Sequence, residues 1–371
     1  MNAPRLVSLQ FLRAFAAVLV AMYHFQPHWN LVAPDTTGPD LSWFGFWGID
    51  VFFVVSGFVM WWTTASPGTA APGVFFVKRL LRIYPTYWLV IGLVCLLHRT
   101  SPVNPLETVL LLPQPLHQMP LPVAWTLTYE IFFYVAFAAL LAFFPDTRTR
   151  RYVVVGVLGT LCLVGIALWL LGDWTRDGHQ TLRVALGFSL WSELLQVGWS
   201  PYQIEFFAGA LVASRFVEER GRSWTPSPLV AAATVAALLA AAILLSIRIF
   251  GEHLNKGHFV FQHVLLFGTP AVLAVCFLCQ QERACEQFAR GRLGRVCLWL
   301  GDGSYSIYLL HTVLFDTAYR LGIREAAAGS GLPGAIAFLL VLPVTIGLSA
   351  AFGNRVELPL YRVLAKRWVP R

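Results

Sequence analysis

Charged residues are scarce in this chain of 371 residues, and that scarcity sets its class. Asp, Glu, Lys and Arg together make up 12% of the sequence, about half the share found in soluble domains, whereas hydrophobic residues make up 57%. Mean hydropathy is +0.65. This composition excludes an ordinary water-soluble domain and predicts an all-α polytopic membrane protein.

Cysteine is also scarce, and its placement excludes an oxidised disulfide framework. Four of the six cysteines lie in apolar runs. Cys276 and Cys279 form a CxxC pair one helical turn apart, but no second pair accompanies it, so both are interpreted as packing residues rather than zinc ligands. The cysteines therefore predict no metal site. No permanently bound cofactor is expected either.

Long apolar runs are abundant, and segments of roughly 20 residues suit the thickness of a bilayer. We expect about ten transmembrane helices, at 6–26, 41–62, 83–97, 122–144, 151–171, 201–217, 229–249, 258–280, 297–319 and 332–353. A further apolar piece, 184–198, is interpreted as interfacial or re-entrant. The proline-rich piece 102–122 is interpreted as an external loop, and the loop 98–121 is the candidate cover of a pocket mouth.

The distribution of basic residues predicts the orientation. Of the 27 Lys and Arg residues, 19 fall in alternate connections that an N-in arrangement places in the cytoplasm, and 7 fall in the others. Both termini are therefore expected inside. The net charge of +8 is interpreted as loop retention and contact with anionic lipid, not as nucleic-acid binding. Because Arg13 interrupts the first apolar run, no cleaved leader is expected, and residues 1–371 are predicted to form one integral-membrane domain without an appended soluble domain.

Two ionisable residues lie inside the first predicted span. Arg13 and His24 are eleven residues apart, which at about 100° per residue places them on one helix face, about 16.5 Å apart along the axis. A lipid-facing stripe of this kind would be costly. We therefore expect this face to line a protein-enclosed channel.

Three more titratable residues are expected at the depth of His24, roughly 12 Å below the outer surface: Asp50, Glu130 and His311. A basic cluster of Lys78, Arg79 and Arg82 is expected at the inner surface, where the third span begins. Each also has a structural interpretation, because the carboxylates could form ion pairs, His311 could bond a carbonyl, and the basic cluster could anchor the topology.

Titratable residues at this depth also suit a different class of protein, a proton-coupled transporter or flippase. Against a carrier, the sequence has no Gly/Pro-broken helices at corresponding positions in two halves. A non-catalytic scaffold would explain the hydropathy but not the buried charges. The residues alone leave the carrier open as the alternative.

The order of several motifs resembles the membrane-bound "acyltransferase 3" family, O-acyltransferases of surface polysaccharides and some small molecules. The resemblance rests on the Arg13 to His24 spacing, GIDVFFVVSGF with Asp50 and Ser56, KRLLRIYP from Lys78, WTLTYEIFFY with Trp125 and Glu130, LGDGSYSIYLLH with Tyr308 and His311, and the tail VELPLYR. Small departures occur at Ile49, Val51 and Thr126, and none removes a titratable group.

The resemblance implies a ten-helix fold that transfers an acetyl or other short acyl group from cytoplasmic acyl-CoA to a hydroxyl. Its implied setting is the bacterial inner membrane. The implied partners are acyl-CoA, a carbohydrate or other hydroxyl-bearing acceptor, and membrane lipids.

The sequence contains side chains that could act as the base or acyl carrier, as its supporting carboxylate and as cations that bind the donor. His24 is predicted to act as general base or acyl carrier, with Glu130 preferred over Asp50 as its supporting carboxylate. Arg13 is predicted to contact the pantetheine arm or a phosphate. Lys78, Arg79 and Arg82 are predicted to hold the nucleotide phosphates at a helix amino end. Supporting or substrate-pathway roles are expected for Asp50, Ser56, Trp125, Tyr308 and His311.

Overall fold

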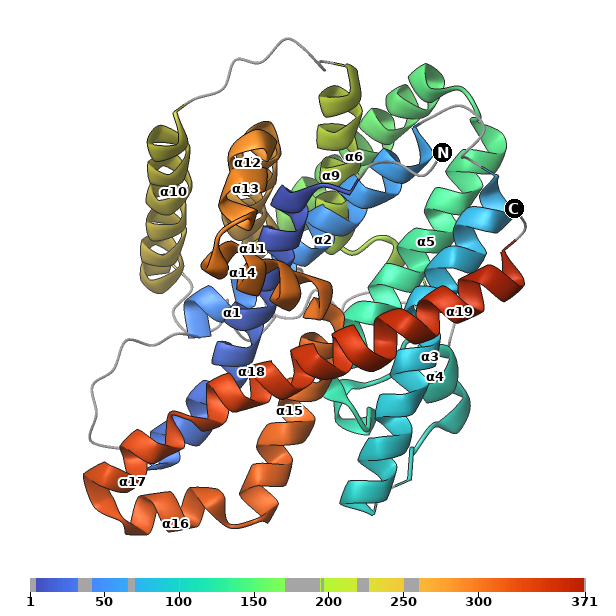
Figure 1. Cartoon of the computed structure of the whole chain (residues 1–371). Helices are drawn as coiled ribbons and strands as arrows, with labels where there is room; N and C mark the ends of the chain where they lie inside the picture. Colours follow the sequence, from blue (N-terminus) through green and yellow to red (C-terminus); the bar gives the residue numbers. More distant parts are fainter. Residues whose placement is uncertain are drawn as a thin grey trace.

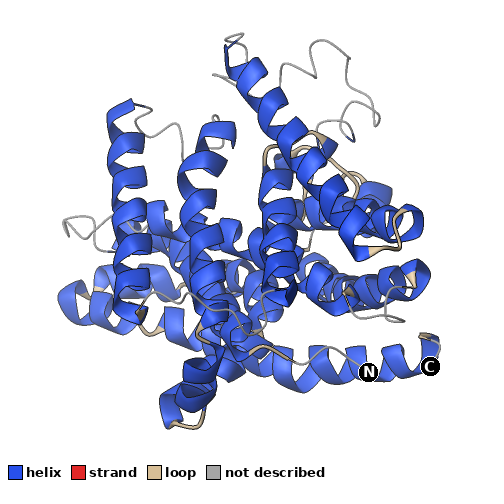
Figure 2. Cartoon of the chain, turned by 90° about the horizontal axis from the view of Figure 1, so that it is seen from above, coloured by secondary structure: helices blue, strands red, loops and turns tan. Residues whose placement is uncertain are grey.

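The structure is a computed structural model that describes residues 5–32, 42–65, 71–99, 101–170, 194, 197–218, 227–249 and 260–369. Helices account for most of these residues and no strand occurs among them, which confirms the all-α prediction (Figure 2). The α-helices are α1 (Val7–Val32), α2 (Ser42–Thr64), α3 (Pro72–His98), α4 (Pro105–Leu110), α5 (Trp125–Phe143), α6 (Thr147–Leu170), α9 (Tyr202–Glu218), α10 (Pro228–Ile249), α11 (Val260–His263), α12 (Thr269–Gln280), α13 (Glu282–Ala289), α14 (Arg292–Asp302), α15 (Ser304–Arg320), α16 (Ile323–Gly329), α17 (Gly331–Phe338), α18 (Val341–Phe352) and α19 (Leu358–Trp368). Two π-helical turns, Val264–Gly268 and Gly353–Glu357, join α11 to α12 and α18 to α19.

Within the described residues, eight helical stretches are long and apolar enough to cross a membrane. The other two expected spans, 201–217 and 297–319, are not among these eight. They correspond to α9 and α15, which are shorter, with 17 residues each. The second of these expected spans is interrupted at Gly303, whose backbone lies against the backbone of α18 and of the π turn that follows it. The predicted segment 184–198 lies almost wholly outside the described residues. The exact number of spans and the orientation stay predictions.

Helix α2 is the central helix of the bundle (Figure 1). Within the apolar stretch Trp47–Thr64 of α2, 78% of the residues are buried, the highest share among the eight stretches. Glycines allow its backbone to touch that of α9: a Cβ atom at Gly57 would clash with the carbonyl oxygen of Phe206, and one at Gly209 with that of Val54. This close approach of small residues is typical of helix packing in membranes, where no hydrophobic force drives helices together.

Replacing Gly209 with alanine should therefore separate α2 from α9 and destabilise the protein by about 1–3 kcal/mol, the usual cost of overpacking. The measurement is the thermal unfolding midpoint in detergent. Gly92→Ala is the matched control, because nothing lies within 4 Å of a Cβ atom at Gly92 in α3. Equal unfolding midpoints for the two variants would contradict the packing argument.

Helix α1 is fixed at its amino end by a distant side chain. The backbone N–H groups of Val7 and Ser8 donate to the two carboxylate oxygens of Glu282 in α13, at 2.5 and 3.0 Å. A carboxylate at this position satisfies otherwise unpaired amides and complements the helix dipole. The contact helps to set the position of α1, and with it the positions of Arg13 and His24.

The part of the predicted cover that follows α3 in the described chain, residues 101–121, packs against the side of α3. Tyr84, Tyr87 and Trp88 donate hydrogen bonds to three successive carbonyl oxygens, those of Leu110, Thr108 and Val109, at 2.7 to 2.9 Å. These bonds give a side-chain partner to carbonyls at the end of the short helix α4, and the carbonyl oxygen of Thr108 also accepts from the backbone N–H of Leu111 at 3.4 Å. The segment contributes no residue to the pocket described below, so its predicted role as a cover is not supported.

Candidate active site

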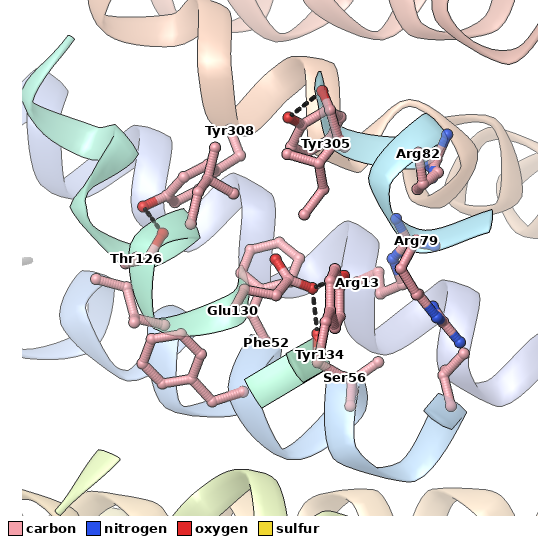
Figure 3. Close-up of a pocket in the computed structure, with 16 residues that line it drawn as sticks. Arg13, Phe52, Ser56, Arg79, Arg82, Thr126, Glu130, Tyr134, Tyr305 and Tyr308 are labelled. Atoms are coloured by element: carbon pink, nitrogen blue, oxygen red, sulfur yellow. Dashed lines mark hydrogen bonds between the residues drawn. The ribbon is translucent and has the colours of Figure 1, made fainter. Parts of the chain in front are cut away.

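A pocket lies where α1, α2, α3, α5 and α15 meet (Figure 3). The empty space among its side chains is about 810 Å³, a figure that includes space open to solvent. One wall is apolar. The polar side chains are Arg13, Ser56, Arg79, Arg82, Thr126, Glu130, Tyr134, Tyr305 and Tyr308. Six residues that were selected from the sequence thus meet around one cavity: Arg13, Ser56, Arg79, Arg82, Glu130 and Tyr308.

Three arginines give the pocket its charge. Arg13 comes from α1, and Arg79 and Arg82 come from successive turns of α3. The guanidinium carbon of Arg79 lies 5.5 Å from the ring centroid of Phe75, and Nη2 of Arg79 donates to Oγ1 of Thr63 at 3.2 Å. Cations of this kind, held by rings and hydroxyls, are suited to binding phosphate.

The position of the basic cluster differs from the prediction. Helix α3 begins at Pro72, not near residue 83, because proline is favoured in the first turn of a helix. Lys78 therefore lies in the second turn, and the amino end of α3 is not at the pocket. Lys78 also does not line the pocket, whereas Arg79 and Arg82 do. Among the three predicted phosphate ligands, the structure brings only the two arginines into the cavity.

Arg82 is held by a buried carboxylate at the other end of the chain. Its guanidinium forms an ion pair with Glu357, whose side chain is 1% exposed and whose Oε2 accepts a 2.5 Å hydrogen bond from Oγ of Ser306. Glu357 is the last residue of a π-helical turn, a feature often found at functional sites. The Arg82 guanidinium also lies 5.9 Å from the ring centroids of Tyr305 and Tyr361. These contacts hold the cation at the pocket wall.

Glu357→Gln should destabilise the protein by about 1.5–3 kcal/mol, the usual contribution of a hydrogen bond to a charged group, because the Arg82 guanidinium, which is 20% exposed, would lose its carboxylate partner. Glutamine keeps an oxygen that can accept from Ser306, so the change isolates the charge. Glu325→Gln is the control: its pair with Arg324 is at the surface, where such a pair contributes about 0–1 kcal/mol. Thermal unfolding in detergent measures both. A Glu357→Gln midpoint equal to that of Glu325→Gln would be inconsistent with this role.

Glu130 lies in the pocket but does not support His24 as predicted. Its Oε1 accepts hydrogen bonds from Oγ of Ser56 at 2.9 Å and from the hydroxyl of Tyr134 at 2.5 Å (Figure 3). Glu130 is in α5 and Ser56 in α2, so the carboxylate joins two helices at the cavity wall. The sequence could place Glu130 at the right depth, but it could not show which helix face it meets.

His24 pairs with the other predicted histidine instead. Its Nδ1 lies 3.1 Å from Nε2 of His311 and 3.0 Å from the carbonyl oxygen of Val20, while Nδ1 of His311 lies 2.9 Å from the carbonyl oxygen of Ile307. His311 is 0% exposed and His24 is half-buried. The sequence predicted both residues at one depth, and the structure brings the two rings together.

The histidine pair lies beyond the end of the pocket. Arg13 and His24 both belong to α1, as expected, but Arg13 lines the pocket and His24 does not. Tyr308 stands between them: it lines the pocket, its ring centroid is 6.1 Å from that of His311, and its hydroxyl lies 2.8 Å from Oγ1 of Thr126. This pocket therefore reaches Arg13 but not His24, and among the residues that the structure describes it does not form the single continuous channel that was predicted.

Asp50 belongs to a separate buried cluster. Both of its carboxylate oxygens lie 3.1 Å from Nε2 of His263, and the two side chains are 0% and 2% exposed. Glu205 of α9 is also buried and interacts electrostatically with Asp50. Asp50 is thus neither at the pocket nor at His24, because its face of α2 is directed toward α9 and α11.

The sequence reasoning missed His263 and Glu205, although a usable signal was present. Each is an ionisable residue within an apolar run, the criterion that identified Asp50 and Glu130. Trp125, by contrast, was singled out but does not line the pocket. It packs in an aromatic cluster, with ring centroids 5.5 Å from those of Tyr129 and Tyr202.

Comparisons with known proteins agree with the motif order. A family model described as an acyltransferase domain matches residues 6–353. The chain is also 29% identical over 346 residues to the exopolysaccharide production protein ExoZ of Rhizobium meliloti (strain 1021), and the alignment covers 89% of this chain and 93% of that protein. No solved protein structure shows a significant match.

Proposed function

Because the chain belongs to the acyltransferase-domain family, which matches it over residues 6–353, we propose that it transfers an acetyl or other short acyl group from acyl-CoA to a hydroxyl of an exopolysaccharide. A glycan acceptor is supported by the similarity to a protein named for exopolysaccharide production. The apolar helices support a reaction at the membrane, which we assign to the bacterial inner membrane.

The observation that carries this proposal is the pocket with three arginines inside an apolar bundle. Buried cations at membrane depth are costly and are typical of functional sites. Coenzyme A has phosphates at one end and a thioester at the other. We assign the phosphates to Arg79 and Arg82, which lie on α3, and the pantetheine arm to the neighbourhood of Arg13 on α1.

The reactive end of the donor belongs at His24. An extended pantetheine arm is on the order of 15–20 Å long, which is comparable to the Arg13 to His24 interval of about 16.5 Å along α1. To reach His24 the arm must pass Tyr308, so donor binding should move that side chain. Exclusion of water by the surrounding helices would protect the thioester from hydrolysis.

The chemistry requires a base or a nucleophile at the thioester. Acting as a base, His24 takes the proton of the acceptor hydroxyl as its oxygen attacks the thioester carbonyl, and the coenzyme A thiolate leaves and receives a proton. Acting as an acyl carrier, the His24 ring first takes the acyl group and the hydroxyl then removes it. Both routes end with an ester and free coenzyme A.

The proposal is tested with inside-out membrane vesicles from cells that express the protein. Vesicles are given acetyl-CoA radiolabelled in the acetyl group, and the glycan fraction is isolated. We expect label covalently attached to glycan and released by mild base, as an O-ester is. Vesicles from cells without the protein are the control. Absence of protein-dependent ester in the glycan would overturn the proposal.

The same experiment addresses the carrier alternative. The buried Asp50, His263 and Glu205 cluster resembles the titratable groups of proton-coupled carriers, and it is the feature that favours this function. A carrier would move a solute or lipid across the membrane without forming a bond to the acetyl group. Only an acyltransferase leaves label in a covalent ester.

A further inference from the structure

We propose that His311 is a positioning residue that holds His24 in the tautomer with its proton on Nδ1 and so leaves Nε2 of His24 as the atom that reacts. The inference rests on the proposed function. It goes beyond it by naming the reacting atom and the group that orients it.

The hydrogen bonds of His311 define its own tautomer. Nδ1 of His311 lies 2.9 Å from the carbonyl oxygen of Ile307, one turn earlier in α15. A carbonyl oxygen only accepts hydrogen bonds, so this nitrogen carries the proton. In a neutral imidazole the other nitrogen, Nε2, then has a lone pair and accepts. Nε2 of His311 is therefore an acceptor aimed at His24.

His24 must then be the donor in the contact between the two rings. Its Nδ1 faces two acceptors, Nε2 of His311 at 3.1 Å and the carbonyl oxygen of Val20 at 3.0 Å. A proton on Nδ1 satisfies both contacts. The opposite arrangement, with His311 donating to His24, would direct a ring lone pair at a carbonyl oxygen in each of the two helices. The proton of neutral His24 thus stays on Nδ1, and Nε2 is a free base.

Burial distinguishes the roles of the two rings. His311 is 0% exposed and both of its nitrogens are engaged, whereas His24 is half-buried and its Nε2 is left without a role in the pair. The His311 ring lies between aromatic rings one turn away on α15, those of Tyr308 and Phe315, each with its centroid 6.1 Å distant. The orienting group is therefore the fixed one, and the reacting group is the accessible one.

In familiar hydrolytic triads a carboxylate orients the histidine. Here the carboxylates that the sequence suggested for this task have other partners: Glu130 accepts from Ser56 and Tyr134, and Asp50 contacts His263. A neutral imidazole can still perform the task. When His24 takes up a proton at Nε2, its Nδ1–H bond to His311 becomes charge-assisted and therefore stronger.

The first test measures initial rates of acetyl transfer in native vesicles, which contain the glycan acceptor. His311→Leu removes the acceptor, and we expect kcat to fall at least about 100-fold, since loss of an orienting partner in a hydrolytic triad costs about 10⁴-fold. The KM for acetyl-CoA should change less than about threefold, because His311 lies outside the donor pocket. His311→Gln, which retains an acceptor oxygen, should recover at least about tenfold of the lost rate.

The matched control is His28→Leu, one turn after His24 in α1, which should keep kcat within about threefold of the unchanged protein. Full activity of His311→Leu would overturn the proposal. So would equal losses in the leucine and glutamine variants, because the acceptor oxygen that glutamine retains would then make no difference to the rate.

A second measurement needs no variant of His311 and keeps the proposal falsifiable even where a substitution prevents folding. Solid-state nitrogen-15 NMR of the histidine-labelled protein in lipid reports which ring nitrogen carries the proton, and the His24 signals are those lost in His24→Gln. We expect a protonated Nδ1 and an unprotonated Nε2 in His24. The reverse would overturn the inference. Absence of transfer by the unchanged protein would instead overturn the proposed function, and the NMR result would stand apart from it.

Discussion

Replacement of His24 with alanine is expected to reduce acyl transfer by at least about 10²- to 10⁴-fold, the usual contribution of a general base. The loss would be larger if the ring also carries the acyl group, because the covalent route would then be closed. Membrane insertion and the unfolding midpoint should change little, since His24 is only half-buried and its partners are one ring and one carbonyl. The measurement is label transfer from acetyl-CoA to glycan in vesicles.

His117→Ala is the matched control, because this histidine is exposed in the segment between α4 and α5 and lies outside the pocket. It should transfer label at the normal rate. A His24→Ala protein that is present at normal amounts and acylates glycan normally would exclude the mechanism proposed for this ring.

Replacement of Arg79 with alanine is expected to raise the KM for acetyl-CoA about 10- to 150-fold, because a hydrogen bond to a charged group contributes about 1.5–3 kcal/mol and each 1.4 kcal/mol is tenfold in affinity. Arg79 is preferable to Arg82 for this test. Arg82 pairs with buried Glu357, so its removal would also destabilise the fold, whereas Arg79 contacts a hydroxyl and two rings. At saturating donor, kcat should be close to normal.

The control for Arg79 is Arg148→Ala, an exposed arginine in α6 outside the pocket, which should leave the KM unchanged. Lys78→Ala adds a direct comparison with the sequence-based assignment. Since Lys78 does not line the pocket, its effect should be much smaller than that of Arg79. Equal effects of Lys78 and Arg79 would indicate that long-range charge attracts the donor and that the pocket does not bind its phosphates.

Several of the sequence predictions concerned single helices, and these were the ones the structure reproduced. Apolar length alone identified most of the bundle, because a run of about 20 apolar residues is recognised without knowing its neighbours. The helix that contains both Arg13 and His24 was likewise expected from its apolar run. The start of α3 was wrong by about eleven residues because the basic run was read as a helix boundary, although Pro72 gave the opposite signal.

The predicted contact between Glu130 and His24, which are on different helices, was wrong. Glu130 was assigned to His24 by depth, yet it bonds to Ser56 and Tyr134, and His24 meets a residue 287 positions away. Depth gives only the position of a residue along the membrane normal, so two residues at the same depth need not be in contact. Which side chains meet at that depth also depends on how each helix is rotated and where it stands in the bundle.

For this protein the sequence by itself determined the membrane class, most of the spans, the placement of Arg13 and His24 in one helix, and the family, because hydropathy and motif order are properties of residues near one another along the chain. The tertiary structure alone decided that Arg79 and Arg82 enter the pocket without Lys78, that Glu357 secures Arg82, and that His311 is the partner of His24. Those contacts join helices far apart in sequence, and they depend on close backbone approaches such as that between α2 and α9, which no local pattern specifies.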